Sequence, residues 1–335
     1  MVNSLISRAQ EGGFTLPTAL MIVVVVLLAL MAVETVYLLL KYMKVSNKLR
    51  ENSSDSDMKQ RAKVNAVEIG KVHEQGKRQY QQDSFGVSDG ALMKSHGLLA
   101  VIADGMGGLS NGDKVSAKAV EQILDSFVMT NGKGTSEQAL LVLANHALKK
   151  VNGFLGEENY RTSGSTLIMG LIKNSTFSFL SIGDSRICLY RDGVLTQLNR
   201  EHIYKNELAL RSVNDELTLQ EVYSNKEGSG LTSYLGMGEL KHIDFPASPI
   251  DIYPGDKIML MSDGIYNALS SNEISSALKL SPEAAAEALR AAIEAKGFSN
   301  QDNYTGIIIE CKETSEPEAV KRVSADNVPH TEQPK

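Results

Sequence analysis

The sequence predicts an α+β fold in which helices cover antiparallel sheet, preceded by one transmembrane helix. Three observations predict it: short strand-like runs joined by tight turns, long stretches with helical periodicity, and an apolar segment near the amino terminus. Of the 335 residues, 42% are hydrophobic and 22% are charged, so a sizeable folded core is expected. The net charge of −6 argues against general nucleic-acid binding.

Strand-like runs rich in branched or apolar residues recur along the middle of the chain. They are Gly97–Ala103, Ser165–Lys173, Thr176–Ile182, Ile187–Tyr190, Lys257–Met261 and Tyr304–Cys311. Lys173–Ser175 and Arg191–Gly193 are typical hairpin connections, because Asn, Asp and Gly tolerate the positive φ that these turns need. Consecutive short hairpins indicate antiparallel sheet.

Helical periodicity appears in two long blocks, each with one apolar face. The apolar positions are Val120, Ile123, Leu124 and Phe127 in the first block, and Leu140, Ala144, Ala147, Leu148 and Val151 in the second. A third helix is framed by Ser281 as N-cap, Pro282 at the first helical position and Gly297 just past the end. We expect these helices to cover sheet faces.

Residues 18–40 are almost wholly apolar and are predicted to form a transmembrane helix. About 23 helical residues span ~35 Å, which is enough to cross a bilayer. Glu34 interrupts the run near its carboxyl end, where a side chain can reach the interface. Basic residues follow the segment at Lys41, Lys44, Lys48 and Arg50. This basic excess predicts a single-pass protein of the inner (plasma) membrane with its main domain in the cytoplasm.

Two other interpretations of the amino terminus stay open. A secretory signal peptide is one, although the apolar run is longer than such a peptide needs and no small-residue cleavage pattern follows it. Residues 13–16 and 20–24 also resemble the processing site and stem of type IV prepilins, which would place the domain outside. Against that resemblance, Thr18 replaces the glutamate of that family and Pro17 interrupts the stem.

Composition predicts the remaining boundaries. Residues 1–17 form a short leader, and residues 41–63 resemble a solvated juxtamembrane tether rich in Ser, Asn, Asp and Lys. Residues 313–335 form a proline-containing tail that is predicted to be disordered. Residues 64–312 remain, and a stretch of roughly 250 residues is consistent with one large domain.

Acidic residues recur where the apolar strands stop or begin. The positions are Asp83, Asp104, Asp184, Asp263 and Asp302. One Asp-Gly pair after a strand usually marks only a turn. Five such carboxylates, however, can converge on one sheet edge.

Converging carboxylates repel one another, so a cluster of them is tolerated mainly when cations neutralise it. Oxygen ligands favour Mg²⁺ or Mn²⁺ over zinc, which prefers His and Cys. Gly105 fits such a site, because a residue without Cβ lets its carbonyl approach an ion closely. The six histidines have no paired ligand spacing, and the two cysteines lie in separate apolar runs.

Six motifs occur in a recognisable order. They are Arg78-x-x-Gln81-Gln82-Asp83, Asp104-Gly105-Met106-Gly107-Gly108, Ser163-Gly164-Ser165-Thr166, Gly183-Asp184-Ser185-Arg186, Ser262-Asp263-Gly264 and Asp302-Asn303-x-Thr305. This order resembles the type 2C, metal-dependent (PPM) serine/threonine protein phosphatase family in its bacterial form, over roughly residues 64–311. Gln81 departs from the usual Asn of that family.

The resemblance implies an α-β-β-α sandwich of two antiparallel sheets flanked by helices, with two Mn²⁺ or Mg²⁺ ions at one end. It also implies hydrolysis of phosphoserine and phosphothreonine on cytoplasmic proteins by a metal-activated water. Carried over by motif, Asp83, Asp104, Asp263 and Asp302 would ligate the metals, with the Gly105 carbonyl beside them. Asp184 matches the position for a third ion, and Arg78 matches the arginine that binds the substrate phosphate.

The implied partners are phosphorylated proteins, including substrates of a serine/threonine kinase. A catalytically inactive, membrane-bound scaffold of the same fold that binds phosphoproteins is the alternative, and metal-dependent turnover separates the two hypotheses. A serine hydrolase is a poorer match, because Ser163–Thr166 lacks the Gly-x-Ser-x-Gly elbow.

Overall fold

The computed structural model describes residues 41, 63–107, 111–130, 132 and 134–313. The chain divides into two compact units, Met1–Arg61 and Ala62–Lys335, and apart from Lys41 everything described below belongs to the second. The predicted leader, the transmembrane segment 18–40, most of the tether and nearly all of the tail lie outside the described residues. Within the described part of the chain, no helix is long and apolar enough to cross a membrane.

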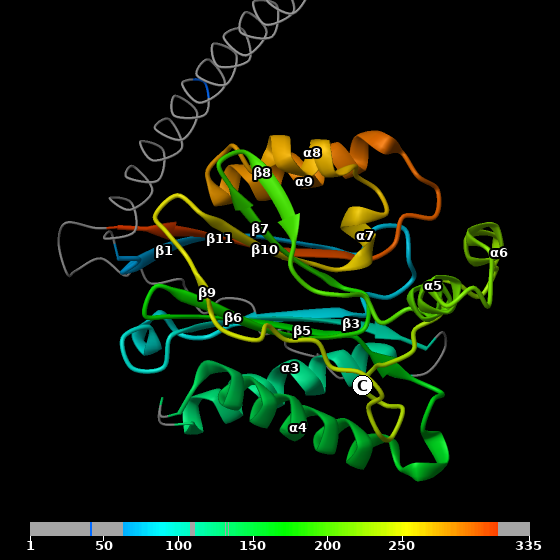
Figure 1. Cartoon of the computed structure of the whole chain (residues 1–335). Coiled ribbons are helices and arrows are strands. Elements are labelled where there is room, and N and C mark those ends of the chain that lie inside the picture. Colours follow the sequence, from blue (N-terminus) through cyan, green and yellow to red (C-terminus); the bar gives the residue numbers. More distant parts are fainter. Residues whose placement is uncertain (1–40, 42–62, 108–110, 131, 133, 314–335) are drawn as a thin grey trace, which may run out of the picture. The chain divides into compact units, whose positions relative to one another are not determined.

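Two antiparallel sheets are stacked at the centre of the second unit (Figure 1). In spatial order, the first sheet contains β1 (Ala66–Glu74), β11 (Tyr304–Lys312), β10 (Lys257–Met261), β7 (Arg186–Arg191) and β8 (Val194–Gln197). The second contains β2 (Asp83–Val87), β3 (Leu98–Met106), β5 (Leu167–Lys173), β6 (Thr176–Ile182) and β9 (Ile250–Asp251), while β4 (Gly164–Ser165) pairs with the end of β3. The predicted antiparallel pairing is confirmed.

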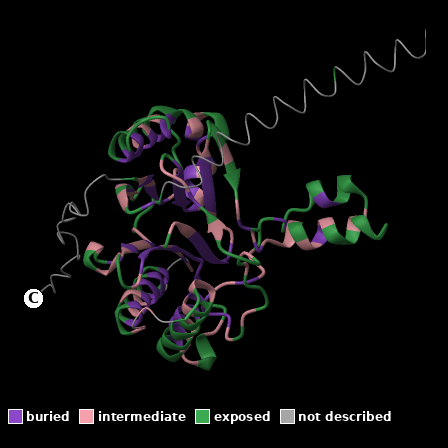
Figure 2. Cartoon of the chain, turned by 60° about the vertical axis from the view of Figure 1, so that its left-hand side comes forward, coloured by how far each residue is buried: buried purple, intermediate pink, exposed green. Residues whose placement is uncertain are grey.

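Helices cover both outer faces of this pair of sheets (Figure 1). The second sheet is covered by α3 (Gly112–Met129) and α4 (Ser136–Leu155), and the first by α7 (Asp263–Tyr266), α8 (Ser271–Ala277) and α9 (Pro282–Lys296). Two further helices, α5 (Tyr204–Val213) and α6 (Leu219–Ser224), project from the side of the sandwich and are largely exposed (Figure 2). The short 3₁₀ turns are η1 (Gly90–Leu92) and η2 (Glu157–Asn159). The α-β-β-α sandwich is therefore confirmed.

The apolar stripes predicted for the two long helices face the second sheet. Val120, Ile123 and Phe127 on α3 are buried together with residues of β3 and β5 in one cluster. Leu140 and Val151 on α4 belong to the same cluster. A second cluster lies between the sheets and a third lies under α8 and α9. These three apolar layers hold the ends of the strands in fixed relation, and the candidate site lies at those ends.

Most of the predicted turn and cap residues behave as their chemistry predicts. Asn174 and Asp192 adopt φ values of 52° and 51° in the two predicted hairpin turns. The helix that begins at Pro282 ends at Gly297, whose φ of 62° suits a left-handed cap. Ser281 precedes this helix but makes no side-chain cap hydrogen bond.

Strand β3 is longer than its apolar run. The sequence predicted that this strand ends at Ala103, but the strand continues to Met106. It does so because Asp104 pairs with Asp83 on β2, and Gly105 pairs with Ser165 on β4. Asp104 therefore lies within a paired strand. Its side chain has a fixed direction there, which it would not have in a turn.

Candidate functional site

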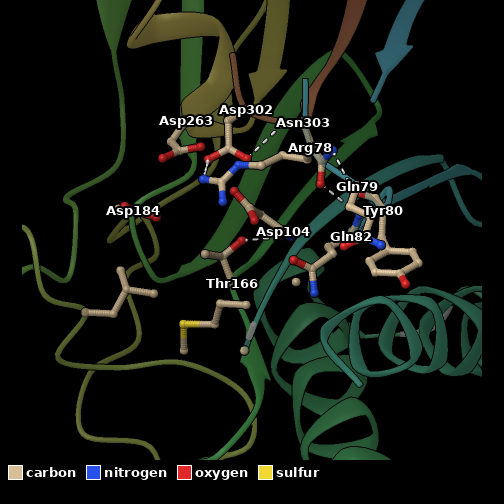
Figure 3. Close-up of a pocket in the computed structure, with 14 residues that line it drawn as sticks. Arg78, Gln79, Tyr80, Gln82, Asp104, Thr166, Asp184, Asp263, Asp302 and Asn303 are labelled. Carbon is tan, nitrogen blue, oxygen red and sulfur yellow. Dashed lines mark hydrogen bonds and ion pairs between the residues drawn. The ribbon is translucent and has the colours of Figure 1, made fainter. Parts of the chain in front are cut away.

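A pocket of about 340 Å³ lies at one end of the sheets (Figure 3). Its lining includes four of the five predicted carboxylates, together with the Arg78 guanidinium; the four are Asp104, Asp184, Asp263 and Asp302. The fifth, Asp83, is not among the lining residues but lies opposite Asp104 in the β2–β3 ladder. The structure thus brings together all five acidic side chains singled out in the sequence.

The five carboxylates come from both sheets, whereas the sequence indicated that they converge on one sheet edge. Asp83 and Asp104 belong to strands of the second sheet, whereas Asp263 follows β10 and Asp302 precedes β11 in the first. Asp184 lies in the connection from β6 in one sheet to β7 in the other. The expectation was wrong because apolar runs reveal strands but not the sheet to which each strand belongs.

Asp83 is the most deeply held carboxylate of the group, with an exposed fraction of 4%. Its Oδ2 accepts hydrogen bonds from Ser262 Oγ at 2.8 Å and from Thr305 Oγ1 at 2.7 Å. Its Oδ1 is buried and has no hydrogen-bond partner. Burial raises the pKa of Asp83 from 3.8 to about 6. A buried oxygen without a partner is costly, and a cation would satisfy it.

Asp104 is positioned through its backbone. Its N–H donates to Thr166 Oγ1 at 3.0 Å, and its carbonyl accepts from the Thr166 N–H at 2.9 Å and from Ser165 Oγ at 3.0 Å. Burial, and then the charges of Asp83 and Asp263, raise its pKa well above the ordinary value. Ser165 and Thr166 of the third motif therefore orient an acidic residue.

Asp184, in the connection from β6 to β7, and Asp263, the first residue of α7, line the same pocket (Figure 3). Burial and the charge of Asp302 raise the pKa of Asp263 to about 6, although Arg78 opposes the shift. Burial and the charge of Asp263 raise the pKa of Asp184 to about 7. The Tyr266 hydroxyl donates to the Asp184 carbonyl at 3.1 Å, which links this loop to α7.

Arg78 forms an ion pair with Asp302 at the mouth of the pocket. The distance from Arg78 Nη2 to Asp302 Oδ2 is 2.6 Å, and the two side chains are 58% and 35% exposed. An ion pair this exposed contributes little to stability, so Arg78 can exchange Asp302 for another anion at small cost.

Asn303 was not assigned a role from the sequence, yet it holds the loop that contains Arg78. The side chain of this buried residue donates to the carbonyls of Gln75 and Tyr80 at 2.7 and 3.0 Å, and it accepts from the Gln82 N–H at 2.9 Å. Its position in the Asp-Asn-x-Thr motif is the sequence feature from which this role could have been predicted. Ser262 and Thr305, which hold Asp83, lie in the last two motifs and were also missed.

Gly105 is required by close packing. A Cβ at this position would lie 2.3 Å from the Gly112 carbonyl oxygen and 2.5 Å from that of Gln82. Only glycine lets the end of β3 approach the start of α3 this closely. The reason expected from the sequence, access of the Gly105 carbonyl to an ion, stays a prediction.

The donor set fits a hard divalent cation. It consists of carboxylate oxygens whose pKa values are raised by burial and by mutual repulsion, so that a counter-charge would favour their ionised forms, and it includes the unpartnered Asp83 Oδ1. Among the residues that the structure describes, however, no three Asp, Glu, His or Cys side chains are already grouped as a metal site. The Arg78 ion pair occupies one Asp302 oxygen in this arrangement.

The crowded carboxylates predict that the metal-free protein is more stable in mild acid. Asp83 and Asp263 have pKa values of about 6 and Asp184 of about 7, all above the ordinary 3.8. A group whose pKa is raised by folding stabilises the fold below its ordinary pKa, and this stability is lost as the pH rises through the raised value. In EDTA, the unfolding temperature should therefore fall between about pH 5 and about pH 8. Added Mn²⁺ should reverse most of the fall, and a flat profile in EDTA would contradict the prediction.

Comparisons with known proteins agree with this geometry. A family model described as protein phosphatase 2C matches residues 69–295. The chain is 26% identical over 238 residues to the serine/threonine phosphatase stp of Listeria monocytogenes, which covers 70% of this chain and 91% of the relative.

Two solved structures are also similar. The S. agalactiae serine/threonine phosphatase matches with a TM-score of 0.64 and 24% identity, covering 74% of this chain and 100% of that one. The catalytic domain of the serine/threonine protein phosphatase PstP, in complex with two manganese ions, matches with a TM-score of 0.58 and 22% identity. This match covers 73% of this chain and 98% of that one. At these identities the two matches show a common fold.

Proposed function

This chain belongs to the protein phosphatase 2C family, and we infer from this that it is a metal-dependent protein serine/threonine phosphatase. We propose that the aspartate-lined pocket is its catalytic centre. The observation that supports the site is the convergence of five carboxylates from both sheets, four of them with raised pKa values, around one arginine. Such a cluster suits bound cations and a phosphate ester better than it suits any neutral ligand.

We propose that Asp83, Asp104, Asp263 and Asp302 hold two Mn²⁺ or Mg²⁺ ions, directly or through water, with the Gly105 carbonyl beside them. When bound, the ions would lower the pKa of a water molecule and offset charge on the phosphoryl oxygens. Asp83 would offer its free Oδ1, while Ser262 and Thr305 retain its Oδ2. Asp184, which faces the pocket with a pKa of about 7, is proposed to hold a third ion.

Arg78 is proposed to bind the substrate phosphate. Its guanidinium offers paired N–H donors that match two phosphate oxygens. It lies at the pocket mouth, and its exposed partner Asp302 can be exchanged for the substrate. The Asn303 hydrogen bonds keep the Arg78 loop in place during this exchange.

The assay that tests this function uses the full chain, a phosphothreonine peptide, p-nitrophenyl phosphate and added Mn²⁺. We expect turnover of both substrates, complete inhibition by EDTA, and loss of activity in Asp263→Ala. Asp125→Ala on the exposed side of α3 is the control and should retain activity. Turnover that survives EDTA or Asp263→Ala would refute the assignment, and a folded protein without metal-dependent turnover would favour the inactive scaffold.

We also propose that residues 18–40 anchor the enzyme in the inner membrane, with the phosphatase domain in the cytoplasm. The length of the apolar run and the basic residues that follow it support this proposal. Its substrates would then be phosphorylated cytoplasmic proteins, including those modified by a serine/threonine kinase. The full chain should sediment with membranes and be released by detergent but not by salt, and release by salt alone would refute the anchor.

A further inference from the structure

The hydrogen bonds behind the pocket extend past Asp83 to a histidine. Thr305 Oγ1, which lies 2.7 Å from Asp83 Oδ2, also lies 2.9 Å from His73 Nδ1. His73 on β1 is directly opposite Thr305 on β11, so the sheet register places both side chains on one face. The His73 ring also packs against Phe85, with the ring centroids 4.9 Å apart. The histidine is thus fixed in place, although it does not line the pocket.

These hydrogen bonds have a single consistent direction. Asp83 Oδ2 is a carboxylate oxygen at neutral pH and can only accept, so Thr305 gives Asp83 its one hydroxyl hydrogen. The Thr305 oxygen must then accept from His73 Nδ1. Burial lowers the pKa of His73, so its ring is neutral and carries one hydrogen, which lies on Nδ1.

We propose that His73 is a positioning residue for the metal site, which acts through Thr305 to keep Asp83 Oδ1 available to a divalent cation. His73 fixes the Thr305 hydroxyl, and Thr305 with Ser262 saturates Asp83 Oδ2. The other oxygen, Oδ1, is left without a protein partner. Without the His73 donor, the Thr305 hydroxyl is free to turn, and Asp83 loses its fixed orientation. This inference rests on the metal site proposed above.

The test compares two substitutions of His73 in the full chain, with Mn²⁺ affinity measured by isothermal titration calorimetry. His73→Leu keeps an apolar side chain against Phe85 but removes the donor. His73→Asn places an amide N–H close to the position of Nδ1. Loss of an outer hydrogen bond to a metal ligand typically weakens metal binding about 10–100-fold. We therefore expect His73→Leu to bind Mn²⁺ about tenfold more weakly than the wild type, and His73→Asn to change the affinity by less than about threefold.

A double-mutant cycle tests whether His73 acts through Thr305. In a Thr305→Val background, His73→Leu should cause no further loss of Mn²⁺ affinity, because the connecting hydroxyl is already absent. The matched control is His146→Leu on α4, which removes a histidine whose Nδ1 lies 3.0 Å from Ser126 Oγ and which does not line the pocket. Its Mn²⁺ affinity should equal that of the wild type.

The outcomes separate this inference from the proposed function. Unchanged Mn²⁺ affinity in His73→Leu, or equal losses in the leucine and asparagine variants, would overturn the role of His73 and leave the phosphatase assignment intact. Full additivity with Thr305→Val would overturn the route through Thr305. A wild-type chain that binds no Mn²⁺ would overturn the metal site and this inference together.

Discussion

Replacement of Asp104 by asparagine should reduce phosphatase activity about 1,000-fold, which corresponds to ~4 kcal/mol of transition-state stabilisation. Asparagine has the same shape but no charge, so it cannot neutralise a cation at the centre of the carboxylate group. The same substitution should stabilise the metal-free protein, because Asp104 is repelled by Asp83 and Asp263 in a buried setting. Each kcal/mol of relieved repulsion raises the unfolding temperature of a domain of this size by about 2–4 °C.

A second buried aspartate provides the control for this prediction. Asp256 is 4% exposed, as Asp83 is, but it accepts hydrogen bonds from Arg191 at 2.6 and 2.9 Å and from the Tyr253 N–H at 2.7 Å. Asp256→Asn breaks a satisfied ion pair, so it should lower the unfolding temperature at pH 7.5 in EDTA. Opposite signs for the two substitutions would show that the active-site cluster is electrostatically strained. A fall in unfolding temperature for Asp104→Asn would contradict that interpretation.

Replacement of Arg78 by alanine should lower kcat/KM for a phosphopeptide about 100-fold, or ~2.7 kcal/mol. In the described part of the chain, Arg78 is the one cationic side chain that lines the pocket. Its removal therefore takes away the protein's own counter-charge for phosphate. It also frees Asp302 from the ion pair, so Mn²⁺ affinity should not fall.

Kinetics at two Mn²⁺ concentrations distinguish a phosphate-binding role from a metal-binding role. If Arg78 binds the phosphate, excess Mn²⁺ should not rescue Arg78→Ala. Arg78→Lys should recover only part of the loss, because an ammonium group is a point charge without the paired donors of a guanidinium. Full rescue by Mn²⁺ would mean that Arg78 acts on the metal site, and equal activity of the lysine variant would mean that paired donors are unimportant.

The sequence predicted the strands and turns that are determined by neighbouring residues in the chain. Apolar runs ending in aspartate marked β10 and the ends of β3 and β6, and the Asn174 and Asp192 turns showed where hairpins form. Strand β1 was not predicted, because its sequence mixes charged and apolar residues. Its strand structure depends on nine pairs with β11, more than two hundred residues away.

The contacts that orient the acidic residues could not be predicted for the same reason. The hydrogen bonds of Asp83 to Ser262 and Thr305 span 179 and 222 residues, and that of His73 to Thr305 spans 232. A motif identifies such residues as a set, but only the strand register shows which side chains face each other. The division of the carboxylates between two sheets is a property of topology that no local pattern contains.

The place of β11 in its sheet affects when the enzyme can first work during synthesis. This strand is the last that the structure describes along the chain, yet it lies between β1 and β10. On the ribosome, a nascent chain that stops short of residue 304 leaves β1 unpaired, and a chain that stops before residue 302 also lacks Asp302. A product that stops before residue 302 is therefore expected to lack phosphatase activity, and we expect dephosphorylation to begin only after residues 302–312 have left the ribosome.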